Sequence, residues 1–168
     1  PYAATVCVAE RHICHREIEK NELLMKHPKS YDSTPETRRR MSKVKLKNGT
    51  AETLLAKKLW HLGYRYRKND KRLPGSPDIA IGKQHIAVFI DGEFWHGKDW
   101  DTRKERLQRN REYWIEKIEE NIARDVRVDK KLRAIGWVPI HFWEKDVLKD
   151  PEGCVSDILA LIVDLYEE

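Results

Sequence analysis

Two short apolar segments, DIAIG and HIAVFID, follow one another with only Gly82, Lys83 and Gln84 as the turn between them. Their β-branched and aliphatic residues favour extended chain, and the glycine favours a turn. The two segments therefore predict adjacent strands that form a hairpin. Any fold for this chain has to place that hairpin in a sheet.

The segments around the hairpin have helical and strand patterns. Apolar residues recur at intervals of three and four from Ala51 to Leu62, and Gly63 ends this predicted helix. A long helical region is expected from about Thr102 to Ile135. Three more elements are expected: a short helix that begins near Pro35, a strand in WVPIHFW, and a closing helix that begins at Pro151. Together these elements predict an α/β fold in which helices flank a small mixed sheet.

Length and composition limit the class of protein. At 168 residues the chain is long enough for one core and too short for two ordinary domains. We expect residues 34–168 to form one domain, preceded by a partly helical N-terminal extension of residues 1–33. Six Trp and six Tyr disfavour disorder, and a formal net charge of +5 suits a polyanionic partner. The apolar segment from Val155 to Val163 is far shorter than the roughly 20 residues that span a bilayer.

The cysteines indicate a reducing compartment. Cys7, Cys14 and Cys154 are an odd number without close pairing, so we expect no disulfide framework and a cytoplasmic protein. His12 and His15 lie beside the first two cysteines, and all four side chains are competent zinc ligands. Their spacing matches no common zinc motif. The preferred interpretation is a small amphipathic helix with buried cysteines.

Two aspartates lie at the ends of the predicted strands. Asp78 follows Pro77 at the start of the first strand, and Asp91 ends the second, so a hairpin can bring the two carboxylates together. Carboxylates that close repel each other unless a hard cation lies between them, and Mg²⁺ is the usual cation in phosphodiester cleavage. The spacing leaves two interpretations open: a metal site, or aspartates that serve as turn residues beside glycines.

Two large aromatic residues, Phe94 and Trp95, follow the second strand, and His96 comes next. Neighbouring aromatics at the end of a strand cannot both face one core, so we expect at least one to be exposed or to face a ligand. Exposed pairs of this kind stack on DNA bases or wedge between them. The alternative is a small core beneath a loop.

Asp125 lies on the same stripe of the long predicted helix as three isoleucines. A desolvated carboxylate needs a partner, because burying an unpaired charge is costly. A histidine whose ring it orients is one candidate. Arg124 and Arg127 are the alternative partners.

Four segments carry a resemblance to a known family: LPGSPDIAI, FIDGEFWHG, EYWIEKIEENIARD and LRAIGWVPIHFWE. In this order and at these intervals, they resemble the very-short-patch mismatch repair endonucleases (Vsr). The resemblance covers about Thr37 to Glu144. It implies a three-layer, restriction-endonuclease-like PD-(D/E)xK fold. It also implies a Mg²⁺-dependent enzyme, with Mn²⁺ as a possible substitute, that nicks one DNA strand beside a thymine mispaired with guanine.

The resemblance also assigns catalytic roles. It makes Asp78 the principal Mg²⁺ ligand, the carbonyl of Ile90 a second ligand, and His96 the general base. Asp125 would orient that histidine. Asp91, which stands where the family has a water-linked histidine, is included in the predicted metal set, and Glu52 would hold metal-bound water.

DNA contacts follow from the same resemblance. Met41, Phe94 and Trp95 match apolar side chains that intercalate beside the mispair. A run of basic residues would contact phosphates: Arg38, Arg39, Arg40, Lys43, Lys45 and Lys47. The expected partner is double-stranded DNA bound by a monomer, with repair-machinery proteins as possible further partners.

The chain departs from the family at its zinc site. The positions of the zinc ligands carry Glu93, Lys98, Trp100 and Lys145, so we expect no structural zinc in this domain. Asp91 in place of a histidine brings the site closer to the two-carboxylate nucleases. Two alternative functions therefore stay open: a restriction-type endonuclease that cuts matched duplex, and a non-catalytic DNA-binding relative.

Overall fold

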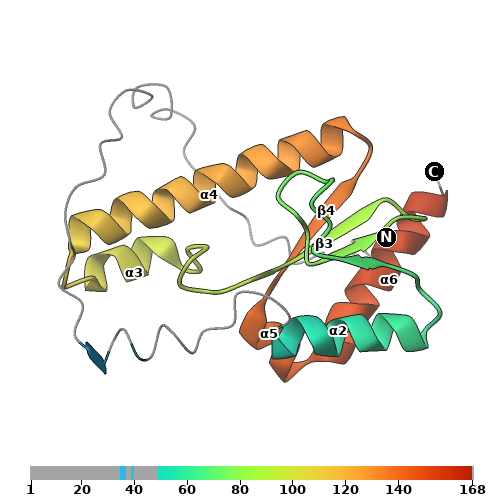
Figure 1. Ribbon diagram of the computed structural model, residues 1–168, viewed down its shortest axis with the longest axis horizontal. Coiled ribbons are helices and arrows are strands. Elements are labelled where there is room, and N and C mark those ends of the chain that lie inside the picture. The colour runs from blue at the N-terminus through green and yellow to red at the C-terminus, as the bar shows by residue number, and fades with distance from the viewer. Residues whose placement is uncertain (1–34, 37–38, 40–48, 168) are drawn as a thin grey trace, which may run out of the picture. The chain divides into compact units, whose positions relative to one another are not determined.

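The computed structural model describes residues 35–36, 39 and 49–167 (Figure 1). Residues 45–168 form one compact unit, which contains the helices and strands that follow. In chain order these are α2 (Thr50–His61), β1 (Arg67–Lys68), β2 (Ile79–Ile81), β3 (Ile86–Asp91), α3 (Trp100–Arg106), α4 (Arg111–Ala134), β4 (Val138–Trp143), α5 (Glu144–Lys149) and α6 (Pro151–Glu167). Pro35, Glu36 and Arg39 are helical, in agreement with the helix expected near Pro35. Within these described ranges, no helix combines the length and apolar character needed to cross a membrane.

The sheet has four strands in the order β1-β2-β3-β4. β2 and β3 form the predicted antiparallel hairpin, in which Ile79 pairs with Val88. β4 lies parallel to β3, with Phe89 opposite His141 and Asp91 opposite Trp143. A parallel neighbour requires a long crossover, and α3 and α4 provide it. The mixed sheet predicted from the sequence is therefore confirmed.

Helices cover both faces of the sheet, because successive side chains of β3 point in opposite directions. Ile86, Val88 and Ile90 pack into the larger apolar core with α2, α5 and α6, whereas Ala87 and Phe89 pack with Leu132 of α4. Figure 1 shows α4 on one side of the strands and α2, α5 and α6 on the other. The result is the three-layer α/β arrangement that the resemblance implies. Asp91 has the same parity as Phe89 and belongs to the α4 face.

Two helix predictions were incomplete. The helical region expected from Thr102 to Ile135 is two helices, because Leu107 is extended and Asn110 has a left-handed backbone (φ 50°) that ends the continuity. Asparagine tolerates this conformation better than most residues. The six-residue α5 was missed, since so short a segment shows no full hydrophobic period.

Candidate active site

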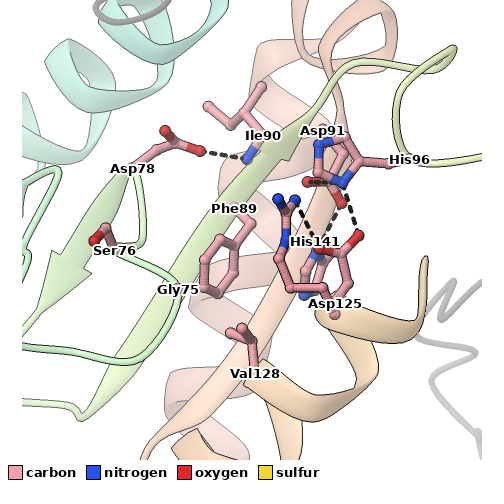
Figure 2. Close-up of a pocket in the computed structure, with 11 residues that line it drawn as sticks. Gly75, Ser76, Asp78, Phe89, Ile90, Asp91, His96, Asp125, Val128 and His141 are labelled. Carbon is pink, nitrogen blue, oxygen red and sulfur yellow. Dashed lines mark hydrogen bonds and ion pairs between the residues drawn. The ribbon is translucent and has the colours of Figure 1, made fainter. Parts of the chain in front are cut away.

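A cleft of about 420 Å³ lies at the carboxyl end of β3, on the face of the sheet covered by α4. Figure 2 shows side chains from β3, β4, α4 and the two adjoining loops pointing into it. Its lining consists of Gly75, Ser76, Asp78, Phe89, Ile90, Asp91, His96, Arg124, Asp125, Val128 and His141. The sequence-predicted residues Asp78, Ile90, Asp91, His96 and Asp125 are therefore all brought together.

Asp78 is a partly buried carboxylate at the start of β2. Its Oδ2 accepts a hydrogen bond from the backbone N–H of Ile90 at 2.8 Å. Burial raises the pKa of Asp78 to about 6, the hydrogen bond opposes this rise, and the negative charges of Glu52 and Asp91 add to it. Since an ionised Asp78 is disfavoured by desolvation and by like charges, a bound cation would stabilise it.

His96 and Asp125 form a close pair across the cleft. His96 Nδ1 lies 2.7 Å from Asp125 Oδ2 and 3.4 Å from Asp91 Oδ1. The buried-carboxylate argument is thus confirmed for a histidine partner, although Arg124 Nη2 also lies 3.4 Å from Asp125 Oδ1. Because carboxylates hold Nδ1, His96 can exchange a proton with a substrate only at Nε2.

The loop that carries His96 is held tightly against α4. The backbone N–H groups of Trp95 and His96 both donate to the carbonyl of Gly92, and Asn121 Nδ2 donates to the carbonyl of Trp95. Gly97 has φ +69°, and a Cβ there would lie 2.5 Å from Ile122 Cδ1. A glycine is therefore required both for the backbone conformation and for the close approach to the helix.

The aromatic pair lies at the end of a larger cluster. Phe94 and Trp95 meet each other and Trp114 edge to face, with ring centroids 5.3–5.6 Å apart, and Trp114 contacts Tyr113. Phe94 is 38% exposed. The expectation that at least one member of the pair is exposed is confirmed. Its role as a wedge in DNA stays a prediction.

Two residues of the site, His141 and Asp129, were missed from the sequence. His141 Nδ1 lies 2.7 Å from Asp91 Oδ2, and its Nε2 lies 2.9 Å from Asp129 Oδ1. Although burial lowers the pKa of His141, the hydrogen bonds to Asp129 and Asp91 raise it to about 9. A signal was present: Asp129 lies one helical turn after Asp125, and the alternation of WVPIHFW places His141 opposite the larger core.

Ion pairs surround the positions that match the family's zinc ligands. Glu93 is in contact with Lys145, lies 3.6 Å from Lys98 and lies 4.0 Å from Arg103, and the hydrogen bond from Lys145 lowers the pKa of Glu93. The fourth position, Trp100, donates from Nε1 to Glu119 of α4 at 3.4 Å. These contacts tie the loop of His96 to α3 and to α5.

The side chains of the cleft supply only some of the ligands that a hard cation needs. Among the residues that the structure describes, no three His, Cys, Asp or Glu side chains are grouped as a metal site. Mg²⁺ is commonly bound by one or two carboxylates together with waters and substrate phosphates. Asp78, Asp91 and Ile90 line the same cleft, so two carboxylates and one backbone carbonyl are the groups that would supply such ligands.

Most of the predicted DNA contacts fall outside the described residues. These are Arg38, Arg40, Met41, Lys43, Lys45 and Lys47. Arg39 is described and exposed. Glu52 lies in the first turn of α2, and its charge acts on Asp78.

Comparison with known proteins gives concordant matches. The profile of a family described as DNA mismatch endonuclease Vsr matches residues 29–102. The type II nicking enzyme V.HpaIIP of Haemophilus parainfluenzae is 55% identical over 77% of this chain and 93% of its own length. The type II nicking enzyme V.NmeDIP of Neisseria meningitidis serogroup C is 46% identical over 78% of this chain and 89% of its own length. The DNA mismatch endonuclease Vsr of Escherichia coli K12 is 33% identical over 62% of this chain and 66% of its own length.

Proposed function

Since the chain belongs to the Vsr family and is therefore a DNA endonuclease, we propose that it nicks one strand of duplex DNA beside a thymine mispaired with guanine. The observation that carries the proposal is the cleft in which Asp78 lies with the His96–Asp125 pair. The names of the relatives V.HpaIIP and V.NmeDIP support cleavage of a single strand. The mismatch substrate is supported through the more distant Escherichia coli enzyme.

The proposed chemistry is hydrolysis of one phosphodiester without a covalent intermediate. Asp78, Asp91 and the carbonyl of Ile90 would hold Mg²⁺, or Mn²⁺ in its place, and the bound ion would supply Lewis-acid stabilisation of the scissile phosphate. His96 takes the proton of the attacking water at Nε2. Asp125 and Asp91 face the Nδ1 side of the ring and stabilise the imidazolium that results.

Selectivity for a mispair would come from opening the base stack. Phe94, Trp95 and Met41 would insert beside the mispair, and unstacking is easier where the bases are mismatched. The half-exposed edge of the aromatic cluster, at Phe94, is the described part of this wedge. Selection therefore begins before any base edge is read.

Nonspecific affinity would come from the basic segment that includes Arg38–Arg40, Lys43, Lys45 and Lys47. Each phosphate contact that is removed should lower affinity for all duplexes alike and reduce the slope of log affinity against log salt by about one. Alanine substitutions in this segment, titrated at several salt concentrations, test that assignment. Unchanged slopes would remove these residues from the interface. Monomeric binding, repair-machinery partners and the cytoplasmic location stay predictions.

The deciding experiment compares duplexes that differ at one base pair. With Mg²⁺ present, the full chain should nick the T:G duplex on one strand and leave the matched duplex and other mispairs largely intact. Labels on both strands report which strand is cut. Cleavage of both strands of matched DNA at the T:G rate would overturn the proposal and favour the restriction-type alternative, while binding without cleavage of any duplex would favour a non-catalytic relative.

A further inference from the structure

His141 is held on both sides by carboxylates and stacked from the strand beside it. Its side chain is 19% exposed, and its ring lies parallel to Phe89 with 4.8 Å between centroids and 13° between planes. Nδ1 faces Asp91 at 2.7 Å and Nε2 faces Asp129 at 2.9 Å. Each ring nitrogen of His141 is therefore within hydrogen-bond distance of one carboxylate oxygen. This fixes the ring in one orientation.

The contacts of His141 continue into those of the proposed base. Asp129 contacts His141, His141 contacts Asp91, Asp91 Oδ1 lies 3.4 Å from His96 Nδ1, and His96 contacts Asp125. Asp125 and Asp129 are one turn apart on α4, so they lie on the same face of that helix. The five side chains therefore form a chain of alternating carboxylates and imidazoles, and both of its ends lie on α4. Figure 2 shows His141 between β3 and α4, directly beside Asp91.

Asp91 needs such a partner. It is 4% exposed, and its charge adds to that of Asp78. A buried carboxylate without a donor is costly and would turn toward any available cation. The donor at His141 Nδ1 occupies Oδ2 and leaves Oδ1 directed at His96.

We propose that His141 is a positioning residue of this endonuclease: through Nδ1 it fixes the Asp91 carboxylate, so that Asp91 Oδ1 faces His96 and the cleft. The proposal rests on the proposed function, because His141 would affect the rate of the nicking reaction in which His96 is the base. Both ring nitrogens of His141 face carboxylates, so its effect on the reaction passes through Asp91.

Two conservative variants test the roles of the two ring nitrogens of His141 one at a time. The amide nitrogen of asparagine is as many bonds from Cβ as Nδ1 of histidine, whereas that of glutamine corresponds to Nε2. His141→Asn keeps a donor toward Asp91, and His141→Gln keeps one toward Asp129. His61→Asn and His61→Gln, at an exposed histidine in the last turn of α2, are the matched controls.

For T:G duplex nicking by the full chain, we expect His141→Gln to lower kcat by about 10- to 100-fold, with KM unchanged, as is usual when the residue that orients an active-site ligand is lost. His141→Asn should stay within about threefold of wild type. In the double variant D91N/H141Q, kcat should be no lower than in D91N alone, because the two residues act as a unit. Equal rates for the Asn and Gln variants, or additive losses in the double variant, would overturn the positioning role while leaving the proposed function intact.

A second measurement does not depend on cleavage. In the metal-free full chain without DNA, NMR should show an Nδ1–H proton of His141 that is protected from exchange with water, because this nitrogen faces Asp91. The absence of that protected proton would overturn the inference even if nicking is normal. A wild-type chain that nicks no duplex would overturn the proposed function, and the positioning role with it.

Discussion

The two faces of the central sheet have opposite characters. The face covered by α2, α5 and α6 is a continuous apolar core. On the α4 face the described apolar cluster is smaller: Ala87, Phe89 and Leu132 are buried, and three partly buried residues pack against them. Three of the four buried polar side chains that the structure describes, Asp91, Asn121 and Asp125, lie on the α4 side. The same strands supply both faces, because side chains alternate along them. One face stabilises the fold, and the other holds desolvated charges for chemistry.

The largest effect is expected on the α4 face, for His96→Ala. Loss of a general base should lower the nicking rate by about 10²- to 10⁴-fold while DNA affinity and melting temperature change little. Single-turnover nicking, a binding titration and a thermal melt on the same sample measure this. His61→Ala is the control. A rate within tenfold of wild type would show that His96 is not the base.

For Leu55→Ala, in the larger core, we expect the opposite result: stability falls and the nicking rate is unchanged. Leu55 is fully buried on α2, so the truncation should lower the free energy of unfolding by about 2–5 kcal/mol. The nicking rate per folded molecule should stay near that of wild type. Urea unfolding and active-site titration measure the two quantities, and Leu62→Ala, at a residue that is 54% exposed, is the control. A selective loss of rate in folded Leu55→Ala would mean that the two faces are coupled.

A gain in stability is expected from Asp78→Asn in the metal-free chain. The folded pKa of about 6 lies above the ordinary aspartate pKa of 3.8, so ionised Asp78 destabilises the fold. This cost is absent below about pH 4, grows between pH 4 and 6, and is complete above pH 6. At pH 8 the free energy of unfolding of the variant should therefore exceed that of wild type by about 1–3 kcal/mol. At pH 3.5 the two should be equal.

Denaturant titrations at the two pH values, with Asp164→Asn as an exposed control on α6, measure the gain. Added Mg²⁺ should stabilise wild type and leave Asp78→Asn unchanged, because the proposed ligand is lost. If the variant is less stable than wild type at pH 8, ionised Asp78 stabilises the fold. The contrast between the two faces would then be weaker than the burial of Asp78 suggests.

Local patterns predicted the parts of the site that depend on one element at a time. Alternation along β3 placed Asp91 with Phe89 and turned Ile90 away, and the helical period placed Asp125 on a buried stripe that proved to meet His96. His141 was missed because its role depends on the parallel register that sets it opposite Phe89. No local pattern encodes that register, since β3 and β4 are separated by two helices.

The ion pairs of Glu93 are a second feature that only tertiary structure reveals, since Lys145 lies beyond β4 in the sequence. Glu93→Gln should have the smallest effect. The pairs with Lys98 and Arg103 are long, and the Lys145 side chain is 75% exposed, so water and salt screen the cluster and the loss of stability should be about 1 kcal/mol or less.

Because the cluster anchors the loop that carries His96, nicking by Glu93→Gln should fall a few-fold at low salt and approach the wild-type rate at high salt, where the wild-type ion pairs are themselves screened. Rates normalised to DNA bound, measured across a salt series, separate this effect from weaker phosphate binding. Glu105→Gln, at an exposed position on α3, is the control. A large loss of stability that salt does not change would mean that the cluster acts as a rigid structural centre rather than a screened surface network.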